Sequence, residues 1–290
     1  MLKLLHRMLN RGDKPLDITA RFDINKVPAR GTGWSIHKAV EKETGKKYSL
    51  KLISPKRAQA YRDRFPKPFE TEGEIMMKCA HANVLPVHET GVTTEGQQYL
   101  LTDPVRDPTL DRFISGEIGS TLPDRVSLIH QLASALFHIH QQGFVHRDIC
   151  PKNLLITDLL TKVKLFDFAL TVPMNKEFHA RSNRTGTPEY MAPEIVRRKP
   201  TDHRVDMFSF GVTAYQLLTF KHPWGTSESD SKSALRHDTF EVTPILEHRP
   251  DLNPRLAKAI HQCLLVNPEK RMPSMKIFIA RTGDIKREAA

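Results

Sequence analysis

Cysteine is scarce in this chain of 290 residues. The three cysteines, Cys79, Cys150 and Cys263, lie far apart and form neither the paired spacing of a zinc site nor the dense pattern of a disulfide framework. We therefore expect a reducing compartment and a cytoplasmic protein. Long apolar runs are missing as well. Because none reaches about 18 residues, we expect no membrane-spanning helix.

Acidic residues are outnumbered by basic ones. The chain has 44 Lys and Arg against 33 Asp and Glu, which gives a formal net charge of +11 at pH 7. Such an excess can attract nucleic acid, a membrane surface or a phosphate-bearing ligand. Because the cations are scattered along the chain, we interpret them as a basic solvent-facing surface and predict no DNA or RNA partner.

Residues 1–11 combine apolar and basic residues at helical spacing, with the apolar ones on one face. This pattern predicts a short basic amphipathic helix, and it lacks the apolar core and cleavage site of a secretory signal. Three roles remain open. The helix could pack on the following domain, make a peripheral contact with a membrane or partner, or serve as an organelle transit peptide.

The residues with the clearest chemical meaning lie in two short segments. Residues 146–153 read His-Arg-Asp-Ile-Cys-Pro-Lys-Asn, and residues 166–169 read Phe-Asp-Phe-Ala. An apolar strand follows Asn153 and another leads to Asp167, so we expect Asp148 and Asp167 at the ends of a hairpin. An Asp that accepts a hydroxyl proton, beside an Asn and an Asp that hold Mg²⁺ on nucleotide phosphates, is what phosphoryl transfer needs, because that chemistry is mostly positioning and charge neutralisation.

In this order the two segments resemble those of the eukaryotic-type serine/threonine protein kinases, and the resemblance extends from about Phe22 to about Phe278. Its most specific part is Gly-Thr-Pro-Glu-Tyr-Met-Ala-Pro-Glu at residues 186–194, which is similar to the end of a Ser/Thr-type activation segment. The resemblance implies an α+β, bilobed fold with a small β-rich N-lobe that carries helix C and a larger, mainly helical C-lobe.

The same resemblance sets the expected domain limits. A chain of this length can form one large domain or two small ones with separate cores. We expect an N-terminal extension over 1–19, a kinase domain over 20–282 with lobes at 20–103 and 104–282, and a short tail over 283–290.

In the small lobe the resemblance implies the nucleotide contacts. Lys51 lies in an apolar strand over 47–53, where a buried cation needs a partner or a phosphate, and Glu72 on a helix predicted over 69–80 is the expected partner. The strand 98–102 leads to a hinge with Thr102 as gatekeeper. There, backbone groups of Asp103 and Val105 are expected to bond adenine, and the intervening proline falls where no N–H is required.

The glycine-rich turn over residues 29–36 is irregular. Counting back from Lys51 puts Ala29 and Trp34 where kinases carry the first and third glycine, so that only Gly31 matches. A shifted pairing would instead use Gly31 and Gly33 with a shorter loop. In either pairing these two glycines would let backbone amides close over the phosphates.

In the large lobe the resemblance implies that Asp148 is the catalytic base and that Asn153 and Asp167 hold Mg²⁺, with Mn²⁺ as an alternative. Cys150 stands where Ser/Thr kinases carry a lysine. Because a thiol cannot neutralise the transferred phosphoryl group, we expect Lys152 to replace that lysine. A redox-sensitive thiolate at Cys150, stabilised by Lys152, is a second hypothesis.

Other residues are expected to support the site. Apolar spacing predicts a core helix over 125–140, ended by Gly143. The resemblance implies that Arg147 binds a phosphate group on the activation segment through paired hydrogen bonds. It also implies that Asp206 holds the backbone of the catalytic loop and that Glu194 forms an ion pair with Arg271. In the activation segment we expect Ser182 and Thr185 to be phosphate acceptors and Thr187 to make a structural contact with the catalytic loop.

Three functions are compatible with these motifs. The first is an ATP-dependent protein kinase that phosphorylates Ser/Thr hydroxyls of protein substrates. It is favoured because all five key polar positions are filled, namely Lys51, Glu72, Asp148, Asn153 and Asp167. The second is a pseudokinase scaffold that binds nucleotide with little turnover. It is suggested by four departures from the family pattern, Ala29, Trp34, Cys150 and Ala169. The third, a small-molecule phosphotransferase, is disfavoured by residues 186–194.

Lys152 also bears on substrate choice. It occupies the position where many basophilic kinases carry a glutamate that pairs with substrate arginine, so we expect it to repel basic substrates. Leu170, which follows the Phe-Asp-Phe-Ala segment, points by resemblance to serine over threonine. We therefore predict a preference for serine in a neutral or acidic context.

Overall fold

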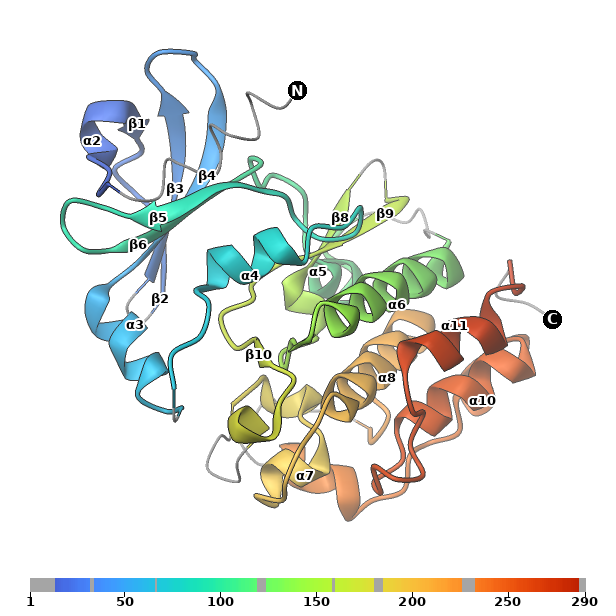
Figure 1. Cartoon of the computed structure of the whole chain (residues 1–290). Helices are drawn as coiled ribbons and strands as arrows, with labels where there is room; N and C mark the ends of the chain where they lie inside the picture. Colours follow the sequence, from blue (N-terminus) through green and yellow to red (C-terminus); the bar gives the residue numbers. More distant parts are fainter. Residues whose placement is uncertain are drawn as a thin grey trace. The chain divides into compact units, whose positions relative to one another are not determined.

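The computed structural model (Figure 1) describes residues 14–31, 34–65, 67–118, 124–157, 160–179, 185–225 and 233–286. The predicted helix over 1–11 lies outside these residues, as do Gly33 and Ser182. The described residues form two compact units. The sheet unit is drawn from 1–80 and 85–106, and the helical unit from 81–84 and 107–290. No helix in the described ranges is long and apolar enough to cross a membrane.

The sheet unit is built on antiparallel strands. These are β1 (Phe22–Ile24), β2 (Ala29–Gly31), β3 (Trp34–Glu41), β4 (Lys47–Ile53), β5 (Val87–Val92) and β6 (Gln98–Thr102). Their order is β1-β3-β4-β6-β5, and β2 pairs with β3 as a hairpin. The helices of this unit are α2 (Ile18–Arg21), α3 (Pro55–Arg62) and α4 (Glu72–Lys78).

Side chains alternate along the central strands β4 and β6, so that one face of these strands is apolar and the other carries polar groups. Tyr48 and Leu50 of β4 join Tyr99 and Leu101 of β6 in a buried apolar cluster. Because successive side chains of a strand point to opposite faces, Ser49 and Lys51 lie on the other face. The same backbone pairing therefore builds the core on one side and gathers polar groups on the other.

The helix predicted over 69–80 begins later, at Glu72. Thr71 ends the preceding loop with a capping box. Its Oγ1 accepts a 3.4 Å hydrogen bond from the Glu74 N–H, and the Glu74 carboxylate accepts one of 2.7 Å from the Thr71 N–H. Phe69 lies outside the helix and makes edge-to-face contacts with Tyr61 and Phe65. The predicted boundary was wrong because apolar spacing alone does not register the cap.

The helix α3 was not predicted, although the sequence carries its start signal. The Ser54 side chain accepts a hydrogen bond from the Arg57 N–H, and Pro55 occupies the first helical position. A serine cap followed by proline is a recognised beginning of a helix. The apolar pattern of α3 is weak, because only Ala58 is buried in it.

The helical unit contains most of the remaining elements. Its helices are α5 (Leu110–Ile114), α6 (Arg125–Gln141), α7 (Pro193–Val196), α8 (Arg204–Thr219), α9 (Ile245–His248), α10 (Pro254–Cys263) and α11 (Met275–Thr282). Short pieces complete it: β7 (Phe144–Val145), β8 (Leu154–Thr157), β9 (Lys162–Leu165), β10 (Val172–Pro173) and the 3₁₀ turns η1 (Pro151–Asn153), η2 (Lys176–His179), η3 (Pro188–Tyr190) and η4 (Ser233–Asp238). The predicted α+β class, with strands in one unit and helices mostly in the other, is confirmed.

The core of the helical unit lies around α8, which is buried along almost its whole length and packs against α6 and α10 (Figure 1). The predicted helix over 125–140 is confirmed as α6, and Gly143 follows it with φ +82°. Residues 81–84 group with this unit because Asn83 is bonded into it. Its Nδ2 donates to Gln131 Oε1 and to the Val163 carbonyl, at 2.9 Å each.

Candidate active site

Lys51 and Glu72 form an ion pair inside the sheet unit. Lys51 Nζ lies 2.7 Å from Glu72 Oε1, and the two side chains are 12% and 6% exposed. Glu72 stands in the first turn of α4, where the helix dipole favours a negative charge. The expected pairing is present, and Glu72 is not a solvated surface charge.

The face of the sheet that carries Lys51 also carries Trp34. The register pairs Trp34 with Ile53 and Ile36 with Lys51, so alternation puts these side chains on one face. The Trp34 ring centroid lies 5.9 Å from Lys51 Nζ, within the range of a cation–π contact. Gly31 pairs with Trp34 at the end of the β2–β3 hairpin. A large aromatic side chain therefore stands beside the lysine where the family pattern has a glycine.

The predicted hinge follows β6 directly. The Val105 N–H donates to Ser49 Oγ at 3.0 Å, and Thr102 Oγ1 donates to the Asp103 carbonyl oxygen at 3.1 Å. The Asp103 carboxylate lies 2.6 Å from Nε2 of His88 on β5. The backbone groups expected to bond adenine thus already have hydrogen-bond partners within the sheet unit.

In the helical unit, Asp206 anchors the catalytic loop. Its carboxylate accepts hydrogen bonds from the N–H groups of His146 (2.8 Å) and Arg147 (2.7 Å) and from His140 Nε2 (2.9 Å). Burial alone would raise the pKa of the Asp206 carboxyl. The hydrogen bonds and the neighbouring histidines outweigh that effect, so the pKa is lowered from its ordinary value. The contact implied for Asp206 is present, and His140 has a structural role.

Two non-glycine residues at this site have left-handed backbone conformations. Arg147 has φ +70° and Asp167 has φ +61°. Such conformations are uncommon outside glycine and persist where the surrounding structure enforces them. At Arg147 the enforcing contact is the bond to Asp206. Next to Asp167, the buried Phe168 packs on His146 with ring centroids 4.7 Å apart, so that residues of both short segments are in contact.

The Asp148 carboxylate is held by three donors. Oδ1 accepts from the Thr187 N–H (2.8 Å) and from Thr187 Oγ1 (2.7 Å), and Oδ2 accepts from Asn153 Nδ2 (3.0 Å). Thr187 thus contacts the catalytic loop, as expected. Because each oxygen has a fixed partner, the orientation of this carboxylate is determined before any substrate binds.

The strands β8 and β9 form the predicted hairpin, pairing Leu154 with Leu165. Asp167 follows β9, but Asp148 does not lie at the hairpin end, because the 3₁₀ turn η1 separates it from β8. Asn153 makes the connection. Its Nδ2 donates to Asp148, and its carbonyl accepts from the Phe166 N–H at 3.0 Å. These bonds bring the residues next to Asp167 close to the loop of Asp148.

Cys150 is a core residue. It is 1% exposed, and burial, together with the charge of Asp148, raises the pKa of its thiol to about 12. Its Sγ lies 3.7 Å from Thr187 Oγ1. A thiol that stays protonated and shielded is a poor redox sensor, so the hypothesis of a redox-sensitive thiolate was wrong. Lys152, in contrast, is exposed.

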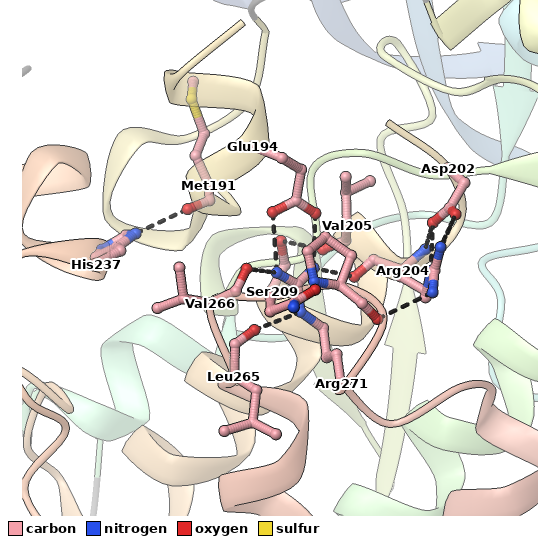
Figure 2. Close-up of polar contacts among 12 residues, drawn as sticks. Met191, Glu194, Asp202, Arg204, Val205, Ser209, His237, Leu265, Val266 and Arg271 are labelled. Atoms are coloured by element: carbon pink, nitrogen blue, oxygen red, sulfur yellow. Dashed lines mark hydrogen bonds and ion pairs between the residues drawn. The ribbon is translucent and has the colours of Figure 1, made fainter. Parts of the chain in front are cut away.

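The expected pair of Glu194 and Arg271 is present and deeply buried (Figure 2). Arg271 Nη1 lies 2.7 Å from Glu194 Oε1 and Nη2 lies 2.9 Å from Oε2, with side chains 0% and 4% exposed. The guanidinium also donates to the carbonyls of Leu265, Val266 and Arg204. This pair ties the end of the activation segment to the chain after α10.

Part of the activation segment is described. Thr185 is half-buried, whereas Ser182 lies outside the described residues. Gly186 has φ +138°, and a Cβ built on it would lie 3.0 Å from the Arg147 carbonyl oxygen. A glycine is required at this position because the backbone of the activation segment passes close to the backbone of Arg147 in the catalytic loop. Arg147 itself is buried, with 3% exposure.

The sequence interpretation overlooked Ser49. Its position two residues before Lys51 on the same strand was the available signal, because alternation puts the two side chains on one face. What could not be foreseen is the partner of its hydroxyl, since Val105 lies 56 residues away.

Two comparisons with known proteins bear on this site. The family model described as "Protein kinase domain" matches residues 26–280. The alpha chain of calcium/calmodulin-dependent protein kinase type II from Drosophila melanogaster is 31% identical over 254 residues, which cover 87% of this chain and 47% of the relative. The chain therefore spans about half the length of this curated relative.

Proposed function

This chain belongs to the eukaryotic-type serine/threonine protein kinases, which are ATP-dependent enzymes, and we propose that it transfers the γ-phosphate of ATP to protein hydroxyls with Asp148 as the base. Both comparisons are with protein kinases, and neither favours the pseudokinase alternative. The observation that carries the proposal is the fixed carboxylate of Asp148, held by Thr187 and Asn153.

The arrangement of donors supports one oxygen of Asp148 as the proton acceptor. Oδ1 already accepts two hydrogen bonds from Thr187, whereas Oδ2 accepts one from Asn153. A carboxylate oxygen has about two lone-pair sites, so Oδ2 keeps the larger accepting capacity. We therefore assign Oδ2 as the atom that orients the substrate hydroxyl and takes its proton.

Asn153 and Asp167 are proposed to hold Mg²⁺, with Mn²⁺ as an alternative ion. The donor set fits, because both hydrogen bonds that position the Asn153 amide use its nitrogen and leave Oδ1 to accept or ligate. Mg²⁺ prefers oxygen ligands and is commonly held by one or two protein oxygens together with phosphate and water. When bound, the ion neutralises charge on the β- and γ-phosphates.

Lys51 and Lys152 are proposed to supply positive charge to the phosphates. Lys51 is held on the sheet face by Glu72 at 2.7 Å, which limits its side-chain freedom before ATP binds. Cys150 is buried and neutral in the position of the usual lysine, so it supplies no charge. The exposed Lys152 is the cation in this loop that replaces it.

A cytoplasmic location is also proposed. The three cysteines Cys79, Cys150 and Cys263 are all free and buried, which agrees with a reducing compartment. The peripheral contact suggested for residues 1–11 lies outside the described residues and stays a prediction.

The direct test is transfer of labelled phosphate from Mg-ATP to a generic protein substrate, measured together with ATP affinity. Asp148→Asn should lower transfer by about 10²-fold or more while ATP affinity stays within a few-fold, because the base does not bind the nucleotide. Asp167→Ala should abolish Mg-dependent nucleotide binding. Asp23→Asn is a matched control, since its side chain is 76% exposed. Ordinary turnover in both site variants would show that the site is misplaced.

We further propose that phosphorylation of Ser182 or Thr185 raises activity. The support is Arg147, a buried arginine that precedes the base and is fixed at its backbone by Asp206. A phosphate that bonds this guanidinium would order the segment that carries Thr187. Activity and phosphorylation are compared between the wild type and a Ser182→Ala/Thr185→Ala double variant. A double variant as active as the wild type refutes the proposal.

A further inference from the structure

We propose that Ser49 acts as an internal competitor for the adenine base, so that its hydroxyl holds the Val105 N–H of the hinge until a purine displaces it. The inference rests on the proposed function, because it concerns the same nucleotide site. It names a residue that sets nucleotide affinity and that has no part in the phosphoryl transfer itself.

Strand register brings the two hydroxyls together. Ser49 on β4 pairs directly with Thr102 on β6, and paired residues of neighbouring strands point to the same face. Thr102 is the last residue of β6, so the chain enters the hinge beside this pair. Lys51 lies on the same face as Ser49, two residues further along β4. The face that carries the phosphate-binding lysine therefore also carries both hydroxyls.

The Ser49 hydroxyl occupies the backbone N–H that would bond adenine. Ser49 Oγ accepts from the Val105 N–H at 3.0 Å, and Thr102 Oγ1 donates to the Asp103 carbonyl at 3.1 Å. Adenine presents an acceptor, N1, and a donor, the 6-amino group, on one edge. These are complementary to an N–H and a carbonyl. The N–H has a single hydrogen, which is already bonded to Ser49, whereas the carbonyl oxygen has a second lone pair for adenine.

The bonds are sheltered from water. Ser49 and Thr102 are 8% and 5% exposed, so their hydroxyls have limited access to solvent as alternative partners. A buried donor or acceptor that loses its partner costs free energy, which makes the internal bonds persistent. A purine that enters must therefore break the hydrogen bond between Val105 and Ser49 before it can bond that N–H itself. Its net gain is smaller than at a hinge whose groups are exposed to water.

The decisive experiment is calorimetric titration of the full chain with Mg-ADP. Ser49→Ala removes the competitor of the Val105 N–H and should tighten ADP binding by about 2- to 10-fold, the net worth of one neutral hydrogen bond. Unchanged or weaker binding by Ser49→Ala overturns the proposal. Weaker binding would instead mean that the Ser49 hydroxyl bonds the purine itself.

A matched control exists in the same sheet. Thr90→Val removes a hydroxyl on β5 that donates to the Tyr99 carbonyl at 2.8 Å. This hydroxyl does not contact the hinge, so the variant should bind ADP like the wild type. If it tightens binding as much as Ser49→Ala does, the effect is general loosening of the sheet, and the proposal fails.

A second measurement uses 1-deaza-ADP, which lacks the N1 acceptor. For each protein it compares the affinities for ADP and 1-deaza-ADP, so that only the ratio of these two affinities is compared between variants. In the wild type, loss of N1 should change affinity by less than about 2-fold, because Ser49 keeps the Val105 N–H bonded. In Ser49→Ala the same loss leaves that N–H unsatisfied and should cost about 5-fold or more. Equal ratios in the two proteins overturn the inference. If neither protein binds ADP at all, the proposed function fails together with it.

Discussion

Replacing Arg271 by methionine removes a buried side chain whose guanidinium is fully hydrogen-bonded. A guanidinium has five N–H groups, and five hydrogen bonds leave this one: two to Glu194 and one each to the carbonyls of Leu265, Val266 and Arg204. The side chain is fully buried. Arg271→Met therefore leaves a buried carboxylate without its cation and three carbonyls without these donors.

The expected loss follows from that geometry. Removing one partner of a buried ion pair costs about 3–5 kcal/mol, and the three carbonyls place this variant toward the upper end. For a domain of this size, such a loss lowers the midpoint of thermal unfolding by on the order of 10 °C. The midpoint is measured by circular dichroism, and a urea titration of the same variant gives the free energy of unfolding directly.

Two further variants separate the ion pair from the loss of a large side chain. The double variant Glu194→Leu/Arg271→Met removes both charges, and it should be more stable than Arg271→Met alone because no buried charge is left unpaired. Arg204→Met is the matched control. The Arg204 side chain is 20% exposed, and its acidic partners Asp202 and Glu269 are 40% and 77% exposed. Because solvent reaches both carboxylates, this change should cost less than Arg271→Met, about 1–2 kcal/mol. An Arg271→Met variant no less stable than Arg204→Met would refute the reasoning.

Three further outcomes are expected. Gly186→Ala should lower phosphoryl transfer by about 100-fold, because a Cβ there meets the Arg147 carbonyl at 3.0 Å. Gly116→Ala introduces backbone strain as well, at φ +79°, but has open space around its Cβ, so it should leave transfer unchanged. Burial lowers the pKa of His237 to about 4, so the unfolded chain binds this proton below pH 6.5 and the folded chain does not. The free energy of unfolding should therefore fall by about 3 kcal/mol as pH drops from 6.5 to 4, and His237→Gln should flatten that slope in urea titrations at several pH values. On a peptide array the wild type should prefer serine in neutral or acidic context, and a Lys152→Glu variant that retains activity should shift the preference toward basic peptides. A wild-type preference for arginine upstream of the acceptor would contradict this role of Lys152.

The sequence alone determined the elements whose signals are local. The apolar strand predicted over residues 47–53 is β4, and the apolar spacing over 125–140 predicted α6. The order of the segments 146–153 and 166–169 indicated the chemistry. These predictions of strands and helices are correct because the apolar pattern of a strand or helix repeats within a few residues of the chain. The same reasoning placed the start of α4 too early, since a side-chain cap at Thr71 overrode the apolar pattern.

Tertiary structure decided the contacts that join distant parts of the chain. Asp206 bonds the backbone of Arg147 across 59 residues, and Thr187 bonds Asp148 across 39. Local propensity predicts neither which two residues bond nor how far apart in the sequence they lie. For these contacts, only the family resemblance had suggested the partners. The burial of Cys150 was decided in the same way, because packing around the loop, and not the neighbouring Lys152, determines whether a thiolate can exist. The bond between Ser49 and Val105 was likewise beyond the sequence, since it depends on the register of β4 against β6 and on where the chain turns after Thr102.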